Sequence, residues 1–125
     1  MTEDLVAPLD EPEWAVAAEE LAAGLRERWP GVRVGLGAVE GSSMRLEALI
    51  PLTPSPRELG IALSGTGRAA TLEPADAEAA AEFAVWYFGR FLAGRQGVHL
   101  IEPATMRTVE LTDGLTPQMV LERLG

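Results

Sequence analysis

The sequence predicts an α+β domain in which helices pack against a single antiparallel sheet of about five to six strands. Two patterns favour this class. Segments that alternate apolar and polar side chains follow one another with short turns between them, which is typical of antiparallel strands. Segments with an apolar repeat every three to four residues lie apart from those strands and predict helices. The expected order of elements is α-β-β-β-(β)-α-β-β-α.

The length of 125 residues fits one domain, and 47% of the residues are hydrophobic, as is usual for a globular chain. Residues 1–12 are acidic and contain two prolines, so we expect them to form a loosely held leader. Residues 13–125 are then the single α+β domain.

The first helix is predicted from Glu13 to Trp29, where Pro30-Gly31 ends it. An apolar stripe recurs every three or four residues along it, formed by Trp14, Ala18, Leu21, Leu25 and Trp29. The acidic residues lie largely off this stripe.

Two strands follow, over Val32–Ala38 and Met44–Ile50, and the turn-forming sequence Glu40–Ser43 joins them into an antiparallel hairpin. A run with three prolines at 51, 54 and 56 predicts an irregular crossing. A third strand is expected over Leu59–Leu63 and a weaker fourth over Arg68–Leu72.

The second helix is expected to start within Glu73–Asp76, with Pro74 near its first position, and to reach about Ala93. Gly94 or Gly97 ends it. Its second half, Phe83–Leu92, is apolar almost all round and predicts the main core element. Either the first helix or a second subunit must cover the side that the sheet leaves free.

The chain closes with strands over Val98–Glu102 and Arg107–Leu111, joined by a loop with Pro103. A short terminal helix follows, with Thr116 as its cap and Pro117 in the first position.

Composition excludes several functions. Without cysteine and with one histidine, the chain has no zinc-thiolate site, disulfide or cysteine nucleophile. A net charge of −9 opposes binding to nucleic acid and anionic membranes.

No signal peptide is recognisable, so we expect a cytoplasmic protein. We predict no enzyme activity, no catalytic or cofactor-binding residues, and no metal site.

The acidity is concentrated near the N-terminus, where residues 1–29 contain eight acids and two arginines, a net charge of −6. Such a surface attracts a basic protein partner, and tryptophan is a frequent interface anchor. The predicted partner-binding residues are Glu13, Trp14, Glu19, Glu20 and Trp29.

Two family resemblances arise from these patterns. The order of elements resembles that of type III secretion chaperones and YbjN-like proteins, which implies a small, acidic, dimeric, non-enzymatic protein. The C-terminal half resembles small bacterial immunity proteins of polymorphic toxin systems in four segments: 80–87, 98–103, 108–111 and 115–118. This second resemblance implies a protein that neutralises a toxin partner.

The sequence therefore favours a non-enzymatic protein-binding module of the immunity type. A secretion-chaperone-like homodimer that escorts another protein is one alternative. The other is a small ligand-binding domain or enzyme that uses His99 together with Glu102 or Glu110.

Overall fold

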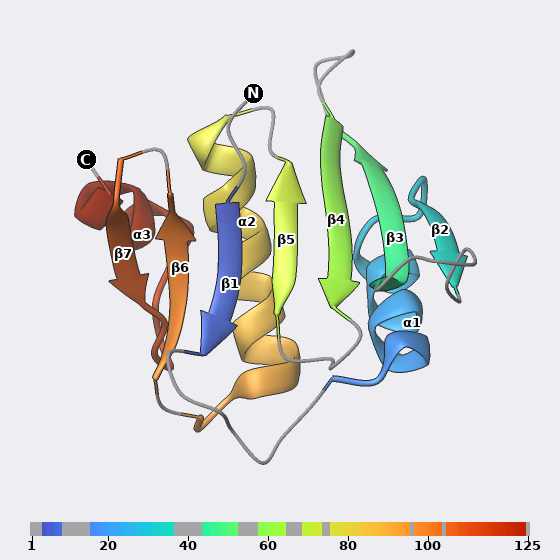
Figure 1. Cartoon of the computed structure of the whole chain (residues 1–125), viewed down its shortest axis with the longest axis horizontal. Coiled ribbons are helices and arrows are strands. Elements are labelled where there is room, and N and C mark those ends of the chain that lie inside the picture. Colours follow the sequence, from blue (N-terminus) through green and yellow to red (C-terminus); the bar gives the residue numbers. More distant parts are fainter. Residues whose placement is uncertain are drawn as a thin grey trace.

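Within the part of the chain that the structure describes, seven strands form one antiparallel sheet, and three helices pack on one of its faces (Figure 1). The computed structural model describes residues 4–8, 16–36, 44–52, 58–64, 69–73, 76–95, 97–103 and 105–124. In chain order the elements are β1 (Asp4–Pro8), α1 (Ala18–Arg28), β2 (Arg33–Leu36), β3 (Met44–Pro51), β4 (Glu58–Ser64), β5 (Ala70–Glu73), α2 (Ala77–Tyr87), η1 (Phe88–Leu92), β6 (Val98–Glu102), β7 (Arg107–Glu110) and α3 (Pro117–Leu124). The predicted α+β class with one antiparallel sheet is confirmed, although the sheet has seven strands rather than five to six.

The extra strand corrects the prediction for the N-terminus. Part of the expected acidic leader, Asp4–Pro8, is strand β1, which lies between β5 and β6 inside the sheet order β2-β3-β4-β5-β1-β6-β7. It pairs antiparallel with both neighbours, and Val6 is fully buried. The segment was missed because only three apolar residues separate Asp4 from Pro8, too few to display a period of two.

The register divides the strand residues between two faces, because directly opposed residues of neighbouring strands point to the same side. One row on the helix-covered face crosses six strands and consists of Leu46, Leu63, Ala70, Val6, Leu100 and Val109, all of them buried. This row is the sheet's half of the hydrophobic core.

The other half of the core comes from α2 and the π-helical turn η1, which follows it directly. Phe83, Tyr87, Phe88 and Leu92 are at most 3% exposed and cover the central strands. The apolar helix predicted over 83–92 is therefore confirmed as the main core element. The change from α-helical to π-helical hydrogen bonding at Phe88 has no signal in the sequence.

The end of α1 and helix α3 both contact α2 and cover part of the side that the sheet leaves free, while Val85 and Trp86 stay half-buried and Glu82 is exposed. Trp29, at the end of α1, stacks on Phe83 with ring centroids 6.4 Å apart. Leu21 and Leu25 are fully buried, as the apolar stripe predicts. The helix begins at Ala18 rather than at Glu13, because Ala17 is extended (φ −77°, ψ 133°).

Side-chain caps and a glycine define the ends of the helices. Thr116 caps α3 as predicted, since its Oγ1 accepts a hydrogen bond from the Met119 N–H at 3.2 Å. Asp76 caps α2 by accepting from the Ala79 N–H at 2.9 Å, so this helix begins just after the predicted start segment. Gly94, with φ +82°, adopts the left-handed conformation that follows the end of η1.

None of the three described helices covers the opposite face of the sheet (Figure 1). One row on this face runs across the strands through Glu47, Ala62, Thr71, Leu5, Ile101 and Thr108. The central members of this row, from Ala62 to Ile101, are half-buried.

Candidate functional site

A shallow groove of about 260 Å³ lies on the helical side of the molecule, between α1 and the α2–η1 segment. We call it the aromatic groove. It is lined by Gly24, Glu27, Arg28, Trp86 and Arg90. Its lining combines one aromatic residue, Trp86, with charged residues, and tryptophan and arginine are both enriched at protein-binding surfaces.

The two helices approach each other closely in the groove because Gly24 has no side chain. A Cβ atom at this position would lie 3.1 Å from Cζ of Phe91 and 3.2 Å from Cζ2 of Trp86. Gly24 therefore allows the aromatic rings to lie against the backbone of α1. It is an interior glycine of a helix, where glycine is disfavoured relative to alanine.

Trp86 is the centre of the aromatic cluster. It meets Trp29 edge to face, with ring centroids 5.0 Å apart and an interplanar angle of 71°. It meets Phe91 in the same way at 5.6 Å and 85°. Because Trp29, Trp86 and Phe91 are all half-buried, each ring packs on the core and is also partly open to solvent. Such aromatic pairs add stability beyond the area that they bury.

Two arginines lie over the outer aromatic rings. The guanidinium carbon of Arg28 is 4.8 Å from the ring centroid of Trp29, and that of Arg90 is 5.3 Å from the ring centroid of Phe91. Both distances are within the range of cation–π attraction. Both arginines are exposed and line the groove.

The acidic residues of α1 stand next to this cluster. Glu20, Gly24 and Glu27 are spaced four and three residues apart, which places them on one stripe of the helix. Glu19 lies beside that stripe in the first turn, and all three glutamates are exposed. The surface around the groove is therefore mixed in charge, with arginines over the rings and glutamates along α1.

The structure places Trp29 against Trp86, which lines the groove, and it places Glu19 and Glu20 on the exposed surface of α1. The other two predicted residues, Glu13 and Trp14, lie outside the described residues. Sequence reasoning missed Gly24, Arg28, Trp86, Arg90 and Phe91. The glycine inside a helical pattern was the one signal in the sequence that could have indicated a close approach at this position.

His99 lies elsewhere, on the uncovered face of the sheet. Its Nδ1 is 3.1 Å from the carbonyl oxygen of Gly97, at hydrogen-bond distance. Glu110 is directly opposite it on β7 and shares its face, whereas Glu102, three residues further along β6, points to the helix-covered face. Of the two candidate acids, only Glu110 is thus placed beside His99. His99 is not among the residues that line the aromatic groove.

Within the described segments, no three His, Asp or Glu side chains lie together in a group that could hold a metal ion. In the same part of the chain, no helix is both long and apolar enough to cross a membrane.

No protein-family model, no curated protein and no solved structure matches this chain.

Proposed function

We propose that this protein is a non-enzymatic binding protein that takes hold of a protein partner through the aromatic groove. The observation that supports the proposal most is the half-buried Trp86 between two ring-stacked arginines, Arg28 and Arg90. Tryptophan and arginine are the residue types that contribute most to binding energy in protein interfaces. The rings are already held by core contacts, so binding would require little ordering of side chains.

The partner is expected to insert an apolar or aromatic side chain against Trp86 and to place basic groups along α1. Glu27 lines the groove, Glu20 lies further along the same stripe of α1, and Glu19 adds a third negative charge to the same helix. Opposite charge on the partner would raise the association rate more than the affinity. The sharpest form of the proposal, an immunity-type protein that neutralises a toxin, adds the C-terminal sequence resemblance to these features.

The proposal is tested by co-expressing the chain with the product of its neighbouring gene. Co-purification of the two proteins and protection of the cells from a toxic neighbour are the expected results. Absence of both would contradict the immunity-type function.

The role of the groove is tested separately, with the purified pair. Arg90→Ala should weaken binding at least tenfold, because it removes a guanidinium that lines the groove, and arginine is among the residue types that contribute most to binding energy in interfaces. Glu110→Gln, on the opposite side of the molecule, is the matched control and should leave the affinity unchanged. Equal affinities for both variants would exclude the groove as the binding site.

A homodimer is the second candidate, and one observation favours it. The centre of the uncovered sheet face is formed by Leu5, Ala62, Thr71 and Ile101, whereas a solvated face of an antiparallel sheet is usually polar. Under this alternative, two copies pack these faces together and leave both aromatic grooves free for a protein that the dimer escorts.

Light scattering at micromolar concentration tests the homodimer. A dimeric mass that Ile101→Arg reduces to the monomeric mass would support it, with Glu122→Arg on α3 as the control. A monomeric wild-type protein would exclude this candidate.

A further inference from the structure

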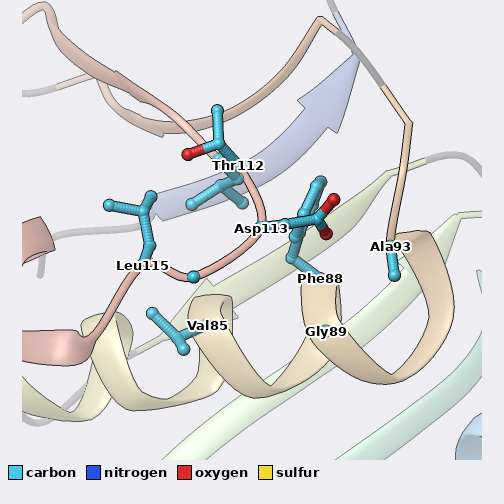
Figure 2. A pocket seen from close by; sticks show the side chains of 9 residues that line it. Val85, Phe88, Gly89, Ala93, Thr112, Asp113 and Leu115 are labelled. Carbon is cyan, nitrogen blue, oxygen red and sulfur yellow. The ribbon is translucent and has the colours of Figure 1, made fainter.

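A second pocket lies at the far side of α2, between η1 and the loop that connects β7 to α3 (Figure 2). We call it the η1 pocket. Its lining residues are Val85, Phe88, Gly89, Ala93, Leu111, Thr112, Asp113, Gly114 and Leu115. It does not share a lining residue with the aromatic groove.

The size of the η1 pocket limits what can bind there. Its volume is about 180 Å³. An apolar cavity of about 150 Å³ can hold a benzene molecule, whereas sites for drug-sized ligands measure roughly 300–1,000 Å³. The η1 pocket therefore fits one ring or a short alkyl chain, and it is too small for a nucleotide or another large cofactor.

Gly89 keeps the pocket open. A Cβ atom built at this residue would meet no atom within 4 Å, and its φ is not in the left-handed region, so neither packing nor backbone conformation requires glycine there. Glycine is nevertheless disfavoured inside a helix relative to alanine. What its lack of a side chain does provide is space beside Phe88. The residue also lies in a π-helical turn, an irregularity found frequently at functional sites.

Asp113 gives the otherwise apolar pocket a negative charge at its rim. The Gly94 N–H donates a hydrogen bond to Asp113 Oδ1 at 3.3 Å, which ties the loop to the end of η1. Figure 2 shows the Asp113 carboxylate at the end of the pocket nearer to Phe88 and Ala93, while Val85 and Leu115 line the other end. Among the described side chains, no arginine or histidine forms a salt bridge with Asp113.

From this combination we propose that the η1 pocket binds a primary alkylammonium group, with its apolar stem on Val85 and Leu115 and its charge beside Asp113. The carboxylate selects a cation, and the apolar walls select a short stem that remains attached to that cation. A free alkylamine and a lysine side chain of a bound protein share this chemistry.

The proposal is tested by NMR titration of the purified protein with n-butylammonium, n-butanol and butyrate, which have similar stems. The amide signals of Gly89, Gly94 and Gly114 report on the pocket. We expect the ammonium to bind about three to five times more tightly than the alcohol, as for one exposed ion pair, and the butyrate to bind more weakly than either. Equal binding of the ammonium and the alcohol would overturn the proposal.

Two substitutions locate the binding. Asp113→Asn retains an acceptor for the Gly94 N–H and should reduce the affinity for the ammonium to that for the alcohol. Gly89→Leu should fill the pocket and abolish the signal changes for both compounds. Gly89→Ala, a milder filling substitution, should weaken both if Gly89→Leu fails to fold. Glu47→Gln, at an exposed position on β3, is the control that should change nothing. Undiminished ammonium binding in Asp113→Asn or in the filled variant would overturn the site.

A parallel titration with Nα-acetyl-lysine methylamide distinguishes the two sources of the cation. Binding of both compounds at the same amides supports a lysine side chain of a partner as the natural occupant. Binding of butylammonium alone supports a free amine. Because the η1 pocket and the aromatic groove have no residue in common, failure of this titration leaves the proposed function untouched, and the reverse also holds.

Discussion

Asp4 on β1 and Glu102 on β6 are neighbours on the helix-covered face of the sheet, one step along the register from the pair Leu5 and Ile101. Asp4 is 3% exposed, and its Oδ1 has no hydrogen-bond partner among the described atoms. Burial raises the pKa of Asp4 above its ordinary value, and the negative charge of Glu102 raises it further. A carboxyl group with this environment is destabilising whenever it is ionised.

The sign of the resulting pH dependence follows from the direction of the shift. The pKa of Asp4 is higher in the folded than in the unfolded protein, so protonation of Asp4 favours the folded state. The stability that protonation contributes is fully present at a pH below the unfolded-state pKa. It is lost as the pH rises through the folded-state pKa. Asp4→Asn should therefore stabilise the protein at pH 7, by about 1 kcal/mol, and should have little effect near pH 3.

Denaturant unfolding of Asp4→Asn and wild type between pH 3 and pH 8 measures this difference. The exposed Glu20→Gln is the control, and its stability should follow that of the wild type across the range. A stability difference that is independent of pH would show that the charge of Asp4 is not the cause.

Tyr87 is the second buried group with an unsatisfied polar atom. The side chain is 1% exposed, its hydroxyl has no partner among the described atoms, and burial raises its pKa above the ordinary value. Tyr87→Phe removes the hydroxyl and retains the ring that stacks on Phe83 at 5.3 Å. We expect a gain of about 1–2 kcal/mol in the free energy of unfolding.

The reciprocal substitution Phe83→Tyr is the matched test for Tyr87. It adds a hydroxyl to a fully buried ring and should destabilise the protein by about 1–3 kcal/mol. A loss of stability in Tyr87→Phe, measured by thermal or denaturant unfolding, would mean that the hydroxyl has a partner after all.

Thr116 provides a test of the terminal helix. Thr116→Ala removes the hydroxyl that accepts from the Met119 N–H and should cost about 1 kcal/mol, as is usual for the loss of a cap. Thr116→Ser keeps the acceptor and should retain most of that stability. Equal unfolding midpoints for the alanine and serine variants would argue against the capping role.

The charge of α1 gives a kinetic prediction that rests on the proposed function. Glu19→Gln combined with Glu20→Gln should slow association with the partner several-fold at low salt, because opposite charges accelerate encounter. The effect should disappear at high salt, where such exposed charges are screened. Surface plasmon resonance at several salt concentrations measures it, and a change confined to the dissociation rate would contradict it.

The elements that the sequence predicted best are those whose own residues determine them. The strands over β3 and β4 follow from alternation that one covered face imposes, and α3 follows from Thr116 and Pro117. Strand β1 could not be predicted because its place between β5 and β6 is decided by pairing with segments far along the chain. The aromatic groove has the same origin. Trp29 was identified by its type, but the partners that make it a site, Trp86 and Phe91, come from another helix.

The two helical glycines, Gly24 and Gly89, form a matched pair because they lie in helices but differ in the atoms around them. The same substitution, glycine to alanine, removes the same backbone entropy in both and would by itself stabilise each helix by about 0.5–1 kcal/mol. The surroundings differ. The added Cβ meets nothing at position 89, but it lies 3.1 Å from Cζ of Phe91 and 3.2 Å from Cζ2 of Trp86 at position 24.

Gly89→Ala should therefore show the full gain in the free energy of unfolding. Gly24→Ala should show less or a loss, because Trp86 and Phe91 must move away from α1 to admit the methyl group. The displaced rings should also change the fluorescence of Trp86 and weaken binding at the aromatic groove, effects that Gly89→Ala lacks. Equal stabilisation by the two substitutions, with unchanged tryptophan fluorescence, would show that the close approach of the helices at Gly24 is not required.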